Sequence, residues 1–141
     1  MRLYLIRHGE TALNVKGCYY GRTDAVLSEK GISQARYLKE ILKEVSFDYI
    51  VASPLVRAYN TAQIVMEERE QEIFGDRRLM EQDFGIFEGM TYKETWNTIQ
   101  KSWMLWNEEF STYRIPKGES FADVRRQGRR FLKGHSVRKR I

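Results

Sequence analysis

Several features that define whole classes of proteins are missing from this sequence. Its single cysteine, Cys18, cannot form an internal disulfide, so a disulfide scaffold is excluded and a reducing, cytoplasmic location is expected. No apolar run approaches the roughly 20 residues that span a bilayer, and we find neither a secretory leader nor an internal repeat. We therefore expect a protein that does not insert into a membrane and is not secreted.

Acidic residues are missing from the C-terminal segment. Of the 24 Lys and Arg residues, eight lie from Arg125 onward with no acid among them, which leaves 16 basic against 19 acidic groups in the rest of the chain. The net charge of +5 thus arises from the end of the chain. A basic segment can bind nucleic acid or an anionic membrane, but zinc-ligand spacing and basic faces with interleaved aromatic residues are missing too. We expect neither partner, and interpret residues 133–141 as a disordered or atypical basic tail.

The features that are present are typical of one globular domain. A length of 141 residues suits a single core, and 42% hydrophobic with 30% charged residues is an ordinary balance, so we expect one domain over residues 1–141. Apolar runs that end in polar residues alternate with helical periodicity, which predicts an α/β fold with a mostly parallel sheet and right-handed crossovers. The predicted strands are Arg2–Ile6, Phe47–Ala52 and Glu72–Phe74, and the predicted helices run from Ser28 to near Val45 and from Ser53 and Pro54 to about Met66.

Other stretches carry local signals. Residues 11–27 have no sustained period and are predicted to form a long loop, and the glycines within residues 83–89 indicate a close-packed turn. A capping box at Thr91 and Glu94 predicts a helix through about Lys101, and the tryptophans and other apolar residues around it suggest a second, aromatic-rich helical piece. Ser120 with Asp123 predicts the cap of a last helix. The expected buried side of that last helix consists of Phe121, Val124, Phe131 and Leu132.

The first predicted strand ends at a potential phosphate site. His8 follows it directly, at the edge where open α/β sheets bind their ligands. A neutral imidazole attacks phosphorus when one ring nitrogen is available and the other donates to a carbonyl or carboxylate oxygen. Arg7 beside it and Arg57 at the start of the second helix could clamp a phosphoryl group. The helix N-terminus behind Ser53 and the amide of Asn14 could add further donors.

The leaving alcohol of a phosphomonoester needs a proton. Glu81 is the best candidate for this general acid, and for the base that later activates water, with Glu88 as the second choice. Taken singly, each of these side chains is more often structural, because a lone histidine, arginine or carboxylate usually serves a hydrogen bond or an ion pair. Only their combination points to phosphoryl transfer.

Five blocks of sequence, in order, resemble the histidine phosphatase superfamily, the phosphoglycerate mutase-like proteins. They cover about residues 1–132, and five ordered blocks together are highly specific. The blocks are Leu5-Ile6-Arg7-His8-Gly9-Glu10-Thr11 with Asn14; Tyr20–Asp24 with Leu27–Gly31; Ser53–Ala58 with Thr61-Ala62; Leu79–Glu81 with Phe84–Gly89; and Pro116–Phe121.

This resemblance implies a fold, a reaction and a set of roles. The fold would be a three-layer α/β/α arrangement, and the reaction would be phosphomonoester hydrolysis through a phosphohistidine, with neither metal nor cofactor. The short connections are most similar to the small phosphatase branch, especially α-ribazole phosphatases of cobalamin synthesis and broad-specificity relatives, which act on small phosphorylated substrates. The implied roles are nucleophile for His8, proton donor for Glu81, and phosphate binding for Arg7, Asn14, Gly21, Arg22 and Arg57.

The resemblance stops near the C-terminus. The family pattern continues to a further strand that closes with a second pocket histidine, whereas His135 is followed by Ser136 and Val137 with no apolar strand before it. We therefore do not assign that role to His135, and expect the chain to lack the last strand or strands. Three hypotheses stay open: an active phosphomonoesterase, a phosphate-binding relative with impaired catalysis, and an oligomer, such as a homodimer, that completes its sheet by strand exchange.

Overall fold

The computed structural model describes residues 2–136, which divide into two compact units. Unit 1 contains residues 2–15 and 24–76, and unit 2 contains residues 16–23 and 77–136. Each unit has its own helices and its own buried residues. The single domain expected over residues 1–141 stays a prediction.

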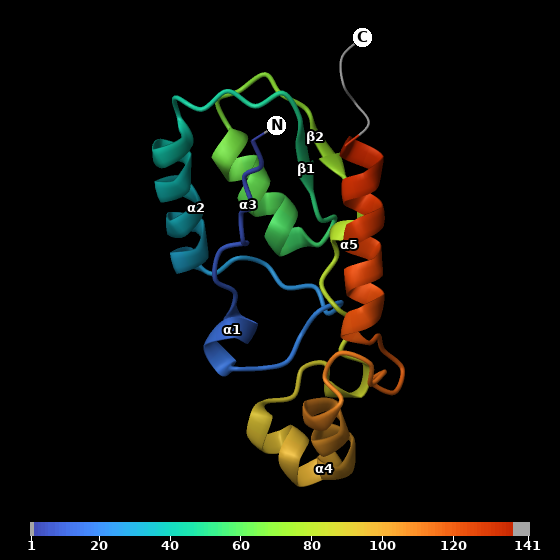
Figure 1. The fold of residues 1–141 in the computed structure, drawn as a ribbon. Helices are drawn as coiled ribbons and strands as arrows, with labels where there is room; N and C mark the ends of the chain where they lie inside the picture. Colours follow the sequence, from blue (N-terminus) through green and yellow to red (C-terminus); the bar gives the residue numbers. More distant parts are fainter. Residues whose placement is uncertain (1, 137–141) are drawn as a thin grey trace. The chain divides into compact units, whose positions relative to one another are not determined.

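Unit 1 is built from two long helices and a short parallel sheet. Helix α3 (Val56–Met66) packs against α2 (Glu29–Leu42) and also contacts the strands β1 (Ile50–Ala52) and β2 (Ile73–Gly75) (Figure 1). The strands pair in parallel, with Ile50 opposite Ile73, so α3 forms the crossover between them. This β-α-β unit confirms the strand–helix–strand order predicted for this stretch, and the predicted strands are longer than the observed ones.

The start of α2 was predicted correctly. Ser28 is extended, and its hydroxyl oxygen accepts the backbone N–H of Gly31 at 3.1 Å, as an N-cap should. The helix ends at Leu42 instead of near Val45 because the guanidinium of Arg69 donates to the carbonyl oxygens of both residues and closes the turn there. Its last apolar residues pack on α3, in a core of Leu42, Val65 and Met66.

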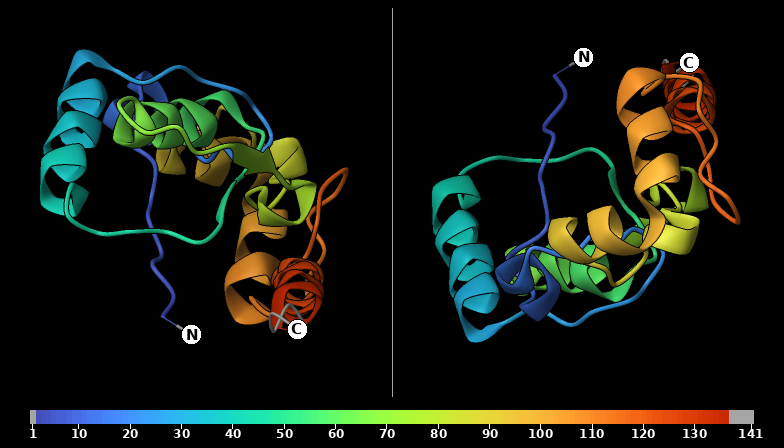
Figure 2. Two further views of the ribbon diagram at one scale, coloured as in Figure 1. Left: turned by 90° about the horizontal axis from the view of Figure 1, so that it is seen from above. Right: turned by 90° about the horizontal axis from the view of Figure 1, so that it is seen from below.

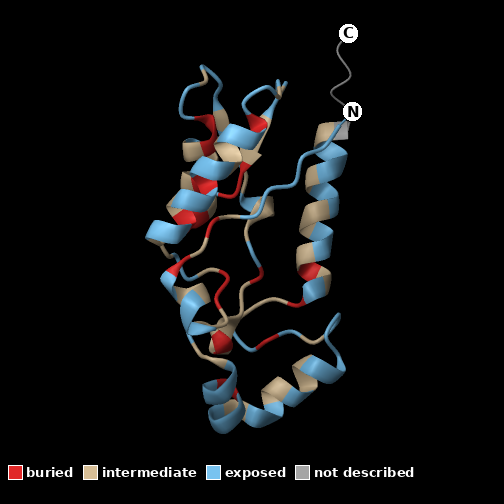
Figure 3. Cartoon of the chain, turned by 90° about the vertical axis from the view of Figure 1, so that its left-hand side faces the viewer, coloured by how far each residue is buried: buried red, intermediate tan, exposed pale blue. Residues whose placement is uncertain are grey.

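The predicted strand Arg2–Ile6 is wrong. The described residues 2–10 contain no strand, and Leu3 and Leu5 are 55% and 87% exposed. The N-terminal segment is accordingly drawn largely in the colour of exposed residues in Figure 3. A strand is stabilised by the ladder it makes with a neighbour, and within the described residues β1 pairs only with β2. Tyr4 still packs edge-on against Phe47, with ring centroids 5.4 Å apart. An apolar run therefore indicates only that a segment can adopt an extended conformation. A β-strand also needs a neighbouring strand to pair with.

Two further predictions in unit 1 are corrected at their boundaries. The loop expected over residues 11–27 contains a helical turn, α1 (Ala12–Lys16). Ser53 and Pro54 do not open α3, which begins at Val56 after the extended residue Leu55. The hydroxyl of Ser53 accepts the N–H of Leu55 at 3.4 Å, so it closes a turn before the helix instead of capping it.

Unit 2 contains the helices α4 (Tyr92–Glu108) and α5 (Phe121–Ser136) and two single 3₁₀ turns, η1 (Arg77–Leu79) and η2 (Gly85–Phe87). The capping box at Thr91 and Glu94 is confirmed, since each side chain bonds the other's backbone N–H. Helix α4 breaks at Ile99, and Figure 2 shows its two parts at an angle. The predicted short helix and aromatic-rich piece are therefore these two parts.

Helix α5 confirms its predicted cap and corrects its predicted face. The hydroxyl of Ser120 accepts the N–H of Asp123 at 3.3 Å. Phe121 and Leu132, eleven residues apart and so on one side of the helix, are 40% and 45% exposed instead of buried. Phe131 does pack, under the guanidinium of Arg78 next to η1. The helix includes the start of the predicted basic tail, and residues 137–141 of that tail lie outside the described residues.

Candidate functional site

The imidazole of His8 is held in one tautomer. Its Nδ1 lies 2.7 Å from the carbonyl oxygen of Gly9, and a carbonyl oxygen only accepts, so the proton is assigned to Nδ1. The lone pair then resides on Nε2. This is the arrangement that the sequence argument required of a histidine nucleophile: one nitrogen donates to a backbone carbonyl, and the other carries the attacking electron pair.

A threonine of α3 fixes the backbone next to this imidazole. The hydroxyl of Thr61 accepts the N–H of the buried Gly9 at 3.1 Å and donates to the carbonyl of Arg57 at 2.7 Å. The segment that carries His8 and the helix that carries Arg57 are therefore joined through one buried side chain, which is 4% exposed. No signal in the sequence predicts this role for Thr61.

The first turn of α2 fixes the other side of the same segment. A Cβ atom on Gly9 would overlap the carbonyl of Gly31, so the two backbones approach as closely as glycine permits. Glu10 adds polar contacts: its backbone N–H donates to Gln34 at 2.9 Å, and its carboxylate accepts the hydroxyl of Ser28 at 3.0 Å. These contacts place residues 8–10 against a helix that is itself well capped.

Asn14 is oriented by a local hydrogen-bond pattern. Its side-chain oxygen accepts both the backbone N–H of Thr11 at 3.0 Å and the hydroxyl of Thr11 at 3.1 Å. With the oxygen used in this way, the amide nitrogen is the atom of this side chain that can donate to a phosphate. The predicted role of Asn14 as a donor agrees with this orientation and stays a prediction.

The two predicted phosphate-binding arginines, Arg7 and Arg57, differ in burial. Arg57 is only 2% exposed, whereas Arg7 is exposed. In the low dielectric around a buried guanidinium an anion is bound more strongly than in water. At the start of α3 the N–H of Val56 donates to the carboxylate of Asp24, at 2.9 and 3.2 Å to its two oxygens. This N–H group, one of the donors predicted at the helix N-terminus, is therefore bonded to Asp24 of the same unit.

Unit 2 carries the other three predicted residues, Gly21, Arg22 and Glu81. Gly21 is buried, and a Cβ atom there would overlap the carbonyl oxygen of Gln82. Three consecutive N–H groups, of Gly21, Arg22 and Thr23, donate to the carboxylate of Glu88 at 2.9, 2.9 and 3.1 Å. Such a run of amides binds anions, and here the anion is a side chain of the same unit.

The guanidinium of Arg22 is also engaged. It donates to the sulfur of Met80 at 3.0 Å and forms an ion pair with Glu119, with 3.0 Å between Nη2 and Oε2. Glu81 itself is exposed, and its Oε1 accepts the N–H of Gln82 at 2.9 Å. The predicted proton donor therefore lies on a well-bonded backbone with its carboxyl group open to solvent. Phosphate binding by Gly21 and Arg22 stays a prediction.

Both carboxylates that hold this part of unit 2 favour their charged form. Burial raises the pKa of Glu88, but hydrogen bonds from Thr23, Arg22 and Phe84 outweigh burial, so the net pKa lies below its ordinary value. Burial likewise raises the pKa of Glu119, and the N–H of Asp83 with the side chains of Arg22 and Gln127 lower it further than burial raises it. An acid must hold its proton to donate it, so Glu88, the second choice for general acid, is poorly suited to that role.

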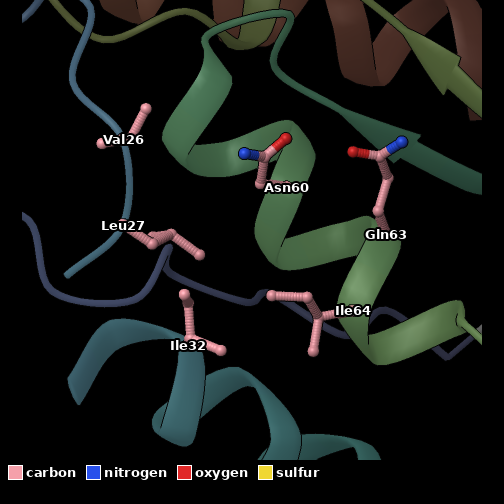
Figure 4. A pocket seen from close by; sticks show the side chains of 6 residues that line it. All are labelled: Val26, Leu27, Ile32, Asn60, Gln63 and Ile64. Atoms are coloured by element: carbon pink, nitrogen blue, oxygen red, sulfur yellow. The ribbon is translucent and has the colours of Figure 1, made fainter. Parts of the chain in front are cut away.

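One hollow of unit 1 is lined by apolar and amide side chains of α2, α3 and the loop before α2. In it Leu27, Ile32 and Ile64 point toward one another, and the amides of Asn60 and Gln63 complete the lining (Figure 4). It includes none of the predicted site residues. Among residues 2–136 the structure contains no group of three or more His, Cys, Asp and Glu side chains that could hold a metal. Within the same range no helix has the length and apolar character to cross a bilayer.

Comparison with known proteins finds a match to one protein family over nearly the whole chain. The sequence pattern described as "Histidine phosphatase superfamily (branch 1)" matches residues 3–140. The adenosylcobalamin/α-ribazole phosphatase of Salmonella typhimurium is 37% identical over 134 residues, which are 94% of this chain and 65% of that protein. Phosphoserine phosphatase 1 of Hydrogenobacter thermophilus is 36% identical over 140 residues, which are 99% of this chain and 65% of that protein.

Solved structures give the same result for the fold. The α-ribazole phosphatase of Shigella flexneri superposes with a TM-score of 0.87 at 33% identity, covering 93% of this chain and 65% of that one. The match confirms the predicted phosphoglycerate mutase-like α/β fold. The chain spans about 65% of the length of the curated relatives named above.

Proposed function

Because the chain belongs to the histidine phosphatase superfamily, we propose that it hydrolyses small phosphomonoesters through a phosphohistidine at His8. The observation that carries this proposal is the 2.7 Å contact between His8 Nδ1 and the carbonyl of Gly9. It supports a ring proton on Nδ1, and in that tautomer the electron pair that would attack phosphorus is on Nε2. The named phosphatases among the relatives favour an active hydrolase over a binding protein without turnover.

The first half of the reaction transfers the phosphoryl group to the enzyme. His8 Nε2 forms a bond to phosphorus while the bond from phosphorus to the ester oxygen breaks, and the carboxylic acid of Glu81 gives its proton to the departing alkoxide. Arg7, Arg57 and the amide of Asn14 hold the charged oxygens, whereas the N–H groups of Gly21 and Arg22 are already bonded to Glu88. Positive charge and positioning supply most of the catalysis, because the transition state spreads its negative charge over these oxygens.

The second half returns the enzyme to its starting state. The carboxylate of Glu81 takes a proton from water, the water oxygen bonds to phosphorus, and the bond between phosphorus and Nε2 breaks. Inorganic phosphate leaves, and His8 again carries its lone pair on Nε2. No group other than water and the substrate is consumed.

The substrate class follows from the names of the relatives. One is called an adenosylcobalamin/α-ribazole phosphatase and another a phosphoserine phosphatase. We propose that the substrate is a small phosphomonoester of the kind these names indicate, with α-ribazole 5′-phosphate as the first candidate. A cytoplasmic location belongs to the same proposal.

A homodimer is a second proposal, supported by the exposed apolar segment that contains Leu3 and Leu5. Pairing with the same segment of a second copy would cover these side chains and give the backbone a ladder partner. Light scattering across a wide range of concentrations tests it: we expect twice the monomer mass, and a monomer throughout would contradict it.

Phosphate release by two histidine variants tests the proposed reaction. The assay uses α-ribazole 5′-phosphate, phosphoserine and p-nitrophenyl phosphate. His8→Ala should lose turnover by on the order of 10⁴-fold or more, because the nucleophile is gone. His135→Ala is the matched control, since its Nδ1 also bonds a backbone carbonyl, that of Phe131 at 2.8 Å. Turnover of His8→Ala at the wild-type rate would overturn the proposal.

A further inference from the structure

We infer that Glu88 and Glu119 are positioning residues, which together hold the backbone around Glu81 so that its carboxyl group is correctly placed to donate a proton. The inference rests on the proposed function, because it assigns these two carboxylates to the placement of the proposed general acid. All the contacts that carry it lie within unit 2.

Glu88 ties the loop of residues 21–23 to the segment that follows Glu81. Its Oε1 accepts the N–H groups of Gly21 and Arg22 and also that of Phe84, at 3.0 Å. Its Oε2 accepts the N–H of Thr23. One half-buried carboxylate thus satisfies four backbone donors from two stretches of chain. Both oxygens are used, so Glu88 acts through the backbone and not on the substrate.

Glu119 makes a second connection between the same two stretches. Its Oε2 accepts the backbone N–H of Asp83 at 3.0 Å and the guanidinium of Arg22 at 3.0 Å. Its own backbone N–H donates to the carbonyl of Asp83 at 2.9 Å, and its carbonyl accepts the side-chain amide of Gln82 at 2.9 Å. Gln127 of α5 orients the other oxygen, Oε1, at 2.6 Å.

These contacts involve the residues on both sides of Glu81 in the sequence. Met80 before it contacts Arg22, and the three residues after it are bonded to Glu119 or Glu88. The side chain of Glu81 is exposed and bonds the N–H of its neighbour Gln82, so the backbone decides where its carboxyl group lies. A misplacement of about 1 Å can cost a reaction roughly a hundredfold. Loss of either connection should therefore damage proton donation before it damages phosphate binding.

Leaving-group dependence separates these two kinds of damage. An alkoxide such as the one that leaves phosphoserine needs a proton, whereas p-nitrophenolate leaves without one. We compare kcat/KM for the two substrates, because this constant reports the steps up to transfer of the phosphoryl group. Glu81→Gln, Glu88→Gln and Glu119→Gln should each lower kcat/KM for phosphoserine by about tenfold or more, with less than about threefold loss for p-nitrophenyl phosphate.

Glu94→Gln is the matched control. This carboxylate also accepts a backbone N–H, that of Thr91 at 2.8 Å, and hydrogen bonds with Thr91 lower its pKa. It caps α4, and the hydrogen bonds of its carboxylate go to Thr91 instead of residues 21–23 or 82–84. Both substrates should react with Glu94→Gln at the wild-type rate. If any Glu→Gln change at a carboxylate that accepts a backbone N–H lowered activity, Glu94→Gln would lower it too.

Hydrogen exchange on the same proteins reports the connection itself. The amides of residues 21–23 and 83–84 should exchange faster in Glu88→Gln and Glu119→Gln than in wild type or Glu94→Gln. Equal losses on both substrates, or no loss on either, would overturn the positioning role. If wild type hydrolyses none of phosphoserine, p-nitrophenyl phosphate and α-ribazole 5′-phosphate, the proposed function fails and the positioning role with it, while faster exchange would then show a purely structural connection.

Discussion

The two units hold their candidate residues by different means. In unit 1, His8 and Gly9 are fixed by neutral groups, namely a backbone carbonyl, the hydroxyl of Thr61 and the close approach of Gly9 to Gly31, although the ionised carboxylate of Glu10 bonds Ser28 and Lys30 next to them. In unit 2, the backbone around Glu81 is fixed by the ionised carboxylates of Glu88 and Glu119. The first kind of support does not depend on charge, whereas the second is lost when a proton binds. The nucleophile and the general acid are therefore expected to respond differently to acid and to mutation.

After loss of the nucleophile itself, the largest expected effect concerns the buried arginine of unit 1, Arg57. Arg57→Ala should lower kcat/KM for p-nitrophenyl phosphate by about 10²–10³-fold, because it removes a preorganised cationic donor from the phosphate. Arg57→Lys should recover only part of the loss, since an ammonium lacks the planar fork. Steady-state kinetics with circular dichroism as the folding check make the measurement.

Arg69→Ala controls for this prediction. Arg69 also lies in unit 1 and binds backbone carbonyls, those of Leu42 and Val45, at the end of α2. The Arg69→Ala variant should be less stable to heat than wild type and should keep its kcat/KM. Activity of Arg57→Ala within about threefold of wild type would show that Arg57 holds no phosphate, well short of the loss expected for such a donor.

A smaller effect is expected from the hydroxyl that supports His8. Thr61→Val keeps the shape of the side chain but leaves the buried N–H of Gly9 without its acceptor. An unsatisfied buried donor costs about 1–3 kcal/mol in the free energy of unfolding, and the imidazole next to it should lose alignment. Denaturant unfolding and kcat together measure both losses.

Thr95→Val is the corresponding change in unit 2. Thr95 is also fully buried, and its hydroxyl donates to the carbonyl of Thr91 at 2.9 Å, but it accepts no bond from a catalytic segment. We expect a stability loss with unchanged kcat. Equal effects of Thr61→Val and Thr95→Val on kcat would remove the special role given to Thr61.

The smallest effect is a difference in acid sensitivity between the units. The pKa values of Glu88 and Glu119 lie below the ordinary value of 4.5, so the unfolded state binds more protons in acid. Their stabilisation is complete above that value and is lost as the pH falls through the lower, folded values. Exchange protection of the amides of residues 21–23 should therefore decrease as the pH falls below about 4.5, more than that of Gly9.

Glu88→Gln sharpens this comparison, because an amide does not titrate. Its protection at residues 21–23 should be lower at neutral pH and should change less on acidification. A decrease of the same size for Gly9 and for residues 21–23, in wild type and variant alike, would mean that the two units do not differ in this respect.

Local signals explain which parts of the fold the sequence predicts well. Ser28, the Thr91–Glu94 pair and the Ser120–Asp123 pair each act within one turn of helix, so their caps can be recognised without knowing the rest of the molecule. The strand predicted for residues 2–6 is wrong for the opposite reason, because it depends on a distant partner. An apolar run becomes a strand only when another strand pairs with it, and that information lies elsewhere in the chain.

The candidate site divides in the same way. His8, Arg57 and Glu81 could be proposed because their side chains have recognisable chemistry next to predicted elements. The supports could not: Gly9 and Thr61 are 52 residues apart, and Gly21 and Glu88 are 67 apart. Glu88 was assigned to acid catalysis only as a second choice, since nothing in its neighbourhood shows that distant N–H groups use both its oxygens. A glutamate followed by glycine at a tight turn was the only signal, and it is a weak one.

The central claim, a phosphoryl group carried by His8, is tested most directly by trapping it. Wild type and His8→Ala are mixed with p-nitrophenyl phosphate labelled with ³²P, quenched in alkaline detergent, and digested for mass spectrometry. We expect a label on wild type that is stable in alkali, lost in acid and mapped to the peptide containing His8, with none on His8→Ala. Turnover by wild type without any such label, or a label that maps to another residue such as His135, would contradict it.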